Sequence, residues 1–127
     1  MQKIIVDMQN FLFADAVATA FENSDYDIEV VSAETPDDTA ELCRLYKPEV
    51  LIMEVTGYPP WRLSERLKLR ETVLSECPEC KIALIVDSNT EKRTAKAIRD
   101  AKKNGIIDQF FYGSMTAEYL MDQVYAM

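Results

Sequence analysis

The chain alternates between two kinds of segment, and this alternation restricts the fold more than any other sequence feature. Five short runs rich in Val and Ile are mostly apolar with little alternation, which is typical of parallel strands covered on both faces. The predicted strands span residues 3–7, 28–31, 49–54, 81–87 and 106–112. A helical pattern follows each strand, and crossovers between parallel strands are right-handed. We therefore predict an α/β fold with a doubly wound, five-stranded parallel sheet.

The intervening segments carry helical spacing and helix-end signals. The predicted helices span residues 10–22, 35–46, 61–76, 89–104 and 115–126. In the first helix, five apolar residues are expected on one face: Phe11, Ala14, Val17, Ala18 and Phe21. Thr35 can serve as N-cap with Pro36 in the first turn, Ser88 and Glu91 have capping-box spacing, and Gly105 ends the fourth helix.

Length and charge narrow the functional classes. At 127 residues the chain fits a single domain over residues 1–127. The net charge is 14 − 22 = −8, and residues 1–60 carry 3 basic and 12 acidic side chains. Such an acidic half repels phosphate backbones, so we expect no direct binding of nucleic acid. Uneven charge suits docking to a protein partner, although solvated faces would give the same pattern.

Membrane and metal functions find little support in the sequence. No apolar run approaches the roughly 18 residues that a membrane span needs, and Asp7 interrupts the first apolar stretch, so we expect a cytoplasmic protein. Cys77 and Cys80 form a CxxC, but the only other cysteine is Cys43 and the chain has no His. A zinc site needs about four ligands, and a redox CxxC usually begins a helix. We therefore interpret Cys77 and Cys80 as packing residues, with reversible disulfide formation between them as the alternative.

Acidic residues follow the predicted strands where ligands bind in such sheets. The first strand ends at Asp7, the third at Glu54, and the fourth near Asp87 and Ser88. Because the carboxyl ends of parallel strands share one edge, we expect two or three of these carboxylates to converge there. No Lys or Arg ends any of these strands.

The chain resembles the receiver domain of bacterial response regulators over nearly its whole length. The resemblance rests on the β-α order, on KIIVDM at the first strand, on KPEVLIME at the third, and on NGIIDQFFYGS around the fifth. It implies the flavodoxin-like (βα)5 receiver architecture with strand order 2-1-3-4-5. The stretch DYDIEVVSAETPDDTAELCRLYKPEVLIME also looks like receivers joined to a helix-turn-helix output domain, which implies a transcriptional regulator with a DNA-binding domain outside this chain.

The resemblance implies that two of the receiver's acidic positions carry other residues in this chain. Receivers typically use a pair of acids after the first strand, and this pair falls on Asp7 and Met8. Met8 cannot ligate Mg²⁺, which prefers oxygen, so no metal or other cofactor is expected. The phosphoacceptor position falls on Glu54, whose extra methylene carries the carboxylate roughly 1.5 Å farther out than an Asp.

The remaining receiver positions are also substituted. The hydroxyl that ends the fourth strand falls on Val86 or Asp87, with Ser88 one step later. The Lys that ends the fifth strand falls on Tyr112, and the aromatic that signals activation falls on Gln109. Phosphoryl transfer needs a nucleophile, a metal and a cation together, so these substitutions predict a degenerate receiver, or pseudo-receiver, that is not an enzyme.

The predicted function is phosphorylation-independent signalling through a protein partner or homodimer. The alternatives are a functional receiver that accepts phosphate on Glu54 or a neighbouring acid, and, more remotely, a small redox or cofactor protein. Three interpretations of Glu54 stay open: it mimics the phosphorylated state, it joins Asp7 and Asp87 in an acidic pocket, or it is an exposed carboxylate without a role.

A possible interface lies on the fourth helix and the fifth strand. Receivers commonly dimerise through this region, and the fourth helix is basic in an acidic protein. Alternation along the predicted edge strand sends at least one aromatic side chain outward. The candidate interface residues are Lys96, Arg99, Phe110 and Phe111.

Overall fold

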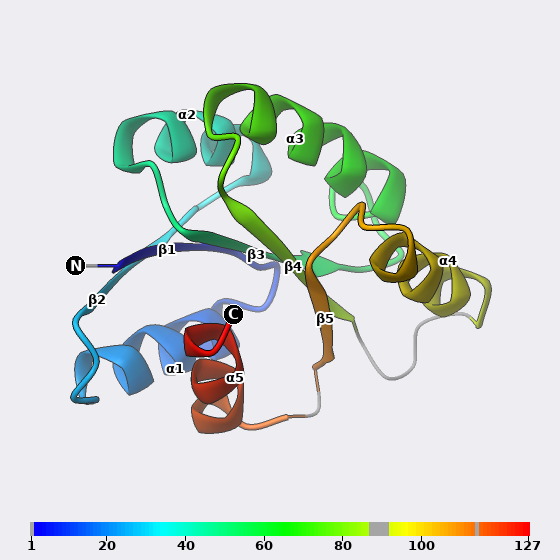
Figure 1. Cartoon of the computed structure of the whole chain (residues 1–127). Helices are drawn as coiled ribbons and strands as arrows, with labels where there is room; N and C mark the ends of the chain where they lie inside the picture. The colour runs from blue at the N-terminus through cyan, green and yellow to red at the C-terminus, as the bar shows by residue number, and fades with distance from the viewer. Residues whose placement is uncertain (1, 87–91, 114) are drawn as a thin grey trace.

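Strands and helices alternate along the whole chain in the computed structural model, which describes residues 2–86, 92–113 and 115–127 (Figure 1). The strands are β1 Gln2–Asp7, β2 Ile28–Ser32, β3 Val50–Val55, β4 Lys81–Val86 and β5 Gln109–Tyr112. The helices are α1 Phe11–Glu22, α2 Pro36–Tyr46, α3 Leu63–Glu76, α4 Lys92–Lys103 and α5 Ala117–Tyr125. The predicted order of elements is confirmed, whereas the predictions on Asp87, Ser88 and Glu91 lie outside the described residues.

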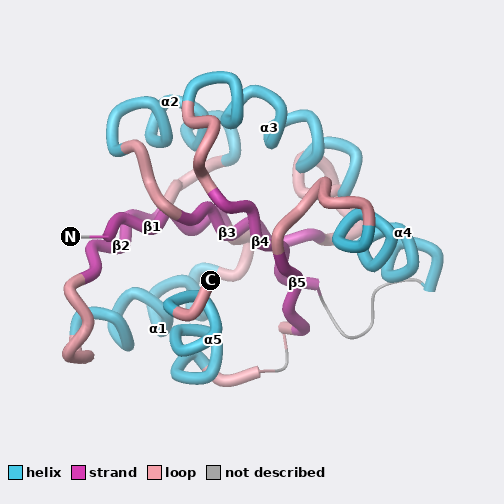
Figure 2. The backbone as a smooth tube through the Cα atoms, in the orientation of Figure 1, coloured by secondary structure: helices cyan, strands magenta, loops and turns pink. Residues whose placement is uncertain are grey.

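The strands form one parallel sheet in the order β2-β1-β3-β4-β5 (Figure 2). β1 lies between its two neighbours, so that Ile4 pairs with Val30 of β2 and with Val50 of β3. This is the predicted doubly wound order 2-1-3-4-5, and the predicted fold class is confirmed. All carboxyl ends therefore meet at one edge of the sheet, and β2 and β5 are its outer strands.

Alternating side chains divide the core into two layers. Ile5 and Leu51 point to the face that α2, α3 and α4 cover, whereas Ile4 and Ile52 point to the face that α1 and α5 cover (Figure 1). Burial on both faces explains why the strands read as nearly continuous apolar runs in the sequence. The direction in which a strand residue points therefore decides which helices it meets.

Local signals explain where the first two helices begin. The Asn10 side chain caps α1 by accepting a hydrogen bond from Phe13 N at 3.1 Å. Pro36 lies in the first turn of α2, as predicted, because its fixed φ suits that position. Thr35 holds the N-cap position of α2, but its hydroxyl donates to Asp38 Oδ2 at 3.2 Å and does not cap the helix.

β5 begins at Gln109, three residues later than predicted. Gly105 adopts φ +75° after α4, as the prediction that it ends this helix requires. The N–H of Ile106 then donates to a carbonyl in the last turn of α4 at 2.8 Å, so this residue completes the helix end. Asp108 makes the first links to β4: its N–H donates to Ile82 O at 2.8 Å, and its carboxylate accepts from Ile82 N at 2.7 Å.

The apolar side of α1 is narrower than predicted. Ala14, Val17 and Phe21 are buried, and Ala18 is half-buried. Phe11 is 57% exposed, because it is the first residue of the helix and lies at the end of the covered face.

Within the described ranges, no helix combines the length and the apolar character that a membrane crossing requires.

Candidate functional site

The carboxyl end of β1 places an acidic side chain in the interior. Asp7 is 1% exposed. It lies two residues after Ile5, so its side chain points to the same face of the sheet, towards α2 and α3. A buried carboxylate is costly unless it is paired and hydrogen-bonded, so its surroundings decide whether it can remain ionised.

Arg66, in the first turns of α3, is the principal partner of Asp7. The two side chains form a forked ion pair, with Nη1 2.7 Å from Oδ2 and Nη2 3.1 Å from Oδ1. Nη2 also donates to the backbone carbonyl of Asp7 at 3.1 Å, and Nε donates to the carbonyl of Glu54 at 2.8 Å. Arg66 is fully buried. Its planar guanidinium thus links β1 and β3 to α3.

Thr39 of α2 completes this arrangement. Its buried hydroxyl donates to Asp7 Oδ2 at 2.6 Å. We call Asp7, Thr39 and Arg66 the buried polar cluster. Among the described residues, no buried side-chain nitrogen or oxygen lacks a hydrogen-bond partner. A fully satisfied polar network in a low-dielectric interior holds its elements in one arrangement.

Glu54 makes its contacts on the other side of the sheet. It follows Ile52 by two residues on β3, so its side chain points to the face covered by α1 and α5. The half-buried carboxylate accepts a hydrogen bond from Asn10 N through Oε1 at 2.9 Å. This position at the start of α1 is favourable, because the N-terminal end of a helix dipole attracts negative charge.

The expected convergence of acidic residues is therefore wrong for Asp7 and Glu54. Asp7 binds donors from α2 and α3, whereas Glu54 binds a donor at the start of α1. Asp87, the third member of the predicted acidic pocket, lies outside the described residues. Although no Lys or Arg ends these strands, α3 supplies the cation that compensates Asp7. The interpretation of Glu54 as an exposed, unengaged carboxylate is also wrong, since it is half-buried and hydrogen-bonded.

Helical spacing in the sequence indicates a buried position for Arg66, although no receiver motif includes this residue. Arg66 precedes Val73 by seven residues, so both occupy the inward side of α3, and both are buried. A basic residue at a core position of one helix, in a chain whose strands end on acids, indicates an internal ion pair. Thr39 gives a similar signal, since it lies four residues before the buried Cys43 on α2.

The predicted positions on β5 have different environments. Phe111 is 5% exposed and belongs to the layer beneath α1 and α5, so its prediction as an interface residue is wrong. Phe110 is half-buried on the opposite face, and Gln109 is also half-buried. Tyr112 is the exposed aromatic residue at the end of the strand, and its ring meets that of Phe110 edge to face with 5.9 Å between centroids. The switch-position equivalent Ser88 lies outside the described residues.

The predicted interface residues of α4 are accessible. Lys96 and Arg99 are exposed, and Lys96 Nζ lies 3.1 Å from Asp100 Oδ2. An exposed pair of this kind contributes little to stability, so Lys96 remains available to other partners. Lys102 Nζ lies 5.7 Å from the centre of the Phe110 ring, which joins α4 to β5 through a cation–π contact.

The three cysteines come from two places in the chain: Cys43 lies in α2, and Cys77 and Cys80 lie between α3 and β4. All are free and buried, and Cys77 Sγ donates to Cys43 O at 3.1 Å. Burial raises the pKa of Cys43 and of Cys80 to about 12. Since the thiolate is the reactive form, neutral buried thiols disfavour the redox alternative. In the part of the chain that the structure describes, no three His, Cys, Asp or Glu side chains are grouped to hold a metal ion.

Solved structures of response regulators share this fold. A response regulator from Thermotoga maritima aligns with TM-score 0.74 and 16% identity, covering 99% of this chain and 97% of its own. A CheY-like receiver domain protein from Methanospirillum hungatei aligns with TM-score 0.76 and 13% identity, covering 99% and 92%. A LuxR-family DNA-binding response regulator from Staphylococcus aureus aligns with TM-score 0.73 and 14% identity, covering 99% and 98%. Neither a protein-family model nor a curated protein matches the sequence. At these identities the comparisons establish the receiver fold.

Proposed function

We propose that this chain is a receiver-like signalling domain that works without phosphorylation and acts by binding a protein partner. The observation that carries the proposal is the fully buried guanidinium of Arg66 on both carboxylate oxygens of Asp7. Asp7 is the one acid of the receiver pair that the chain retains, and it is already neutralised from within.

The residues at this position do not suit Mg²⁺. Magnesium takes oxygen ligands in near-octahedral geometry. Both carboxylate oxygens of Asp7 accept hydrogen bonds from Arg66 or Thr39, and the neighbouring Met8 is buried and offers only a thioether. A divalent cation would have to displace the guanidinium, which would leave a buried positive charge without its partner. We therefore include the absence of a magnesium site in the proposal.

Glu54 and Tyr112 support the same conclusion. Phosphoryl transfer needs one carboxylate oxygen aligned for in-line attack, and the N–H of Asn10 holds Glu54 Oε1 in a hydrogen bond. Tyr112 stands where receivers place a Lys, and it offers no positive charge for the transferred group. A functional phospho-accepting receiver would need the other oxygen of Glu54 as nucleophile, without a cation at residue 112, and the Asn10 contact favours a structural role for Glu54 over mimicry of phosphate.

The proposed partner contact lies on the exposed surface of α4 and β5. Lys96, Arg99 and Tyr112 are exposed there, and Phe110 is half-buried beside them. The likeness to a LuxR-family DNA-binding response regulator supports the idea that this domain serves a cytoplasmic transcriptional regulator with a separate output domain. In that arrangement the receiver-like domain supplies protein contacts, and the output domain supplies DNA contacts.

Intact-mass spectrometry after incubation with acetyl phosphate and Mg²⁺ tests this function. The expected result is an unchanged mass under conditions that phosphorylate a conventional receiver treated in parallel. A stoichiometric phosphoryl adduct that maps to Glu54 or Asp7 would overturn phosphorylation independence and establish the phospho-accepting alternative.

A further inference from the structure

α4 carries a row of positive charge directed away from the core. Its inward side is marked by the buried Ile98 and Ala101. Four exposed basic residues recur at intervals of four, three and four positions, which at 3.6 residues per turn places them within roughly 60° of one another, opposite that buried pair. This basic stripe consists of Lys92, Lys96, Arg99 and Lys103.

The other end of the sheet carries a hollow with an acidic rim. A groove of about 360 Å³ lies between the end of β2 and α2. This acidic groove is lined by Ser32, Glu34, Asp38, Glu41, Leu42 and Leu45. Leu45 is 68% exposed and gives the groove an apolar element. No Lys or Arg occurs between Lys3 and Arg44 in the sequence, and Arg44, whose Nη2 lies 3.4 Å from Glu41 Oε1, offsets only part of the charge of the rim.

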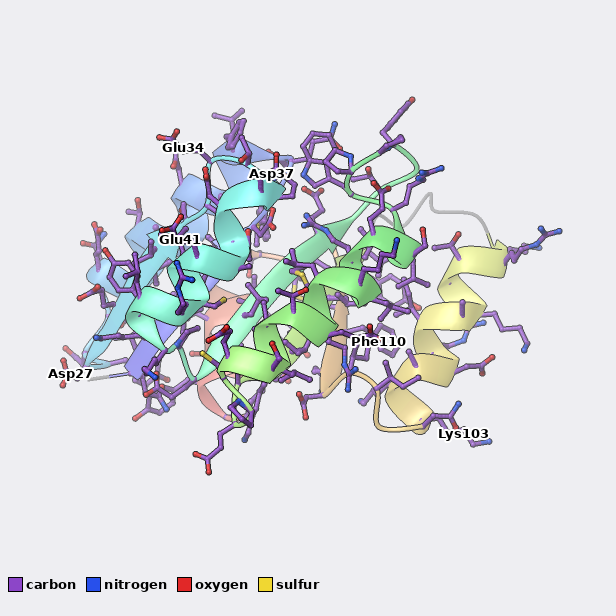
Figure 3. The ribbon with its side chains drawn as sticks, turned by 90° about the horizontal axis from the view of Figure 1, so that it is seen from above. Asp27, Glu34, Asp37, Glu41, Lys103 and Phe110 are labelled. Atoms are coloured by element: carbon purple, nitrogen blue, oxygen red, sulfur yellow. The ribbon has the colours of Figure 1, made fainter. Side chains whose placement is uncertain are left out.

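The two surfaces cannot meet within one molecule. Figure 3 shows Glu34, Asp37 and Glu41 around α2 on one side and Lys103 on α4 at the opposite side. This separation follows from the strand order, because the groove adjoins β2 and the helix that carries the stripe packs against β5, and these are the two outer strands. Opposite charges at opposite ends of one molecule are complementary between two copies.

We propose that the basic stripe of one copy docks into the acidic groove of a second copy. The carboxylates of Glu34, Asp38 and Glu41 would face ammonium and guanidinium groups, and Leu45 would contact the aliphatic stems of these long side chains. The contact is heterologous, so it leaves a stripe and a groove open at the two ends and permits short chains of molecules. The inference deepens the proposed function and rests on it, because it names a second copy as the partner of α4.

Two opposing effects set the conditions for this association. Each copy carries a formal charge of −8, and this net repulsion acts over long distances. At about 0.1 M salt the Debye length is roughly 10 Å, so the distant repulsion is weakened more than contacts inside a docked interface. The exposed pair between Glu41 and Arg44, at 3.4 Å, contributes little and can exchange partners. We therefore expect reversible self-association near 0.1 M salt and its loss at 1 M.

Sedimentation velocity with two charge-reversed variants tests the docking mode. The groove variant Glu34→Lys/Glu41→Lys and the stripe variant Lys96→Glu/Arg99→Glu each place like charges on both surfaces. Each variant alone should associate at least about tenfold more weakly than the wild type. An equimolar mixture should regain association, because the unaltered stripe of one variant meets the unaltered groove of the other.

Matched variants separate this contact from effects of net charge and folding. Asp15→Lys/Glu22→Lys makes the same change in net charge as the groove variant, from −8 to −4, at two exposed residues of α1, and it should associate at least as well as the wild type. If a reversed variant fails to fold by circular dichroism, Glu34→Gln/Glu41→Gln takes its place and should weaken association in the same direction.

Three results would overturn the inference. They are a wild type that stays monomeric at all concentrations, a groove variant that associates like the wild type through some other surface, and a mixture of the two reversed variants that stays monomeric. None of these measurements involves Mg²⁺ or a phosphoryl group. Failure of the docking inference therefore leaves the question of phosphorylation independence unchanged, because the mass measurement tests that separately.

Discussion

Arg66 occupies a helix position that periodicity assigns to an apolar residue, and its surroundings explain how the charge is tolerated there. Asp7 supplies both side-chain oxygens and its own carbonyl, and Glu54 supplies a second carbonyl. Removing one member of a buried ion pair lowers the free energy of unfolding far more than replacing both members by apolar residues, because the remaining charge then has neither water nor a partner. The pair therefore contributes more to holding one arrangement than to net stability.

We predict that Arg66→Met lowers the free energy of unfolding by about 3–5 kcal/mol, because it leaves the Asp7 carboxylate buried without its counter-ion. Urea denaturation followed by circular dichroism measures this change. The double variant Asp7→Asn/Arg66→Met removes both charges and should recover part of the loss. If the free energy of unfolding of Arg66→Met lies within about 1 kcal/mol of the wild-type value, the pair is less desolvated than its burial implies.

Glu54 should behave as a support for α1. Glu54→Ala removes both the acceptor for Asn10 N and a negative charge at the start of the helix, so we expect a loss of about 1 kcal/mol of unfolding free energy. Glu54→Gln keeps the hydrogen-bond acceptor, so its free energy of unfolding should fall by only about 0.3 kcal/mol. Equal urea midpoints for the wild type and the Ala variant would contradict this role.

At the level of elements, the buried polar cluster joins parts of the chain that are distant in sequence. Thr39 comes from α2, Arg66 from α3 and Asp7 from β1, and the carbonyl of Glu54 adds β3. The connection between α4 and β5 depends instead on one backbone conformation. Gly105 adopts a φ of +75° there, and a Cβ at this position would meet no atom within 4 Å.

We predict that Gly105→Ala destabilises the protein by about 1 kcal/mol, through backbone strain in the left-handed region and not through a clash. The urea midpoint measures the effect. Gly57→Ala is the matched control, since a Cβ there also meets nothing within 4 Å and Gly57 has no left-handed φ. The control should be neutral or slightly stabilising. A similar loss in both variants would rule out the conformational explanation.

Local patterns allowed the element order to be predicted, whereas contacts between elements limited the prediction of the site. Apolar runs and helix caps identify the strands and most helix ends, because these signals act within a few residues. The late start of β5 was missed because Ile106 completes the end of α4 before the chain extends. Asp7 was correctly predicted to end β1, and Glu54 lies one residue before the end of β3. The ion pair of Asp7 was not predicted, since its partner Arg66 lies 59 residues away in the sequence.

For the whole molecule, the sheet has the order of the receiver fold, and the acid that ends β1 forms an internal ion pair with Arg66 of α3. A conventional receiver would keep acids open to a metal and a phosphoryl group. Here Asp7 is 1% exposed and its counter-ion is covalently part of the chain. Under the proposals made above, signalling depends on the charged surfaces at the two ends of the sheet and needs no change at the carboxyl edge.

Titration with Mg²⁺ and beryllofluoride, followed by amide NMR shifts, tests the central claim most directly. Beryllofluoride with Mg²⁺ imitates a bound phosphoryl group, so it requires the acid site to accept a metal ion and a beryllofluoride group on a carboxylate oxygen together. We predict no saturable shifts at Asp7, Met8, Glu54 or Arg66 under conditions that saturate a conventional receiver. Saturable shifts at these residues, with loss of the contact between Arg66 and Asp7, would contradict the account.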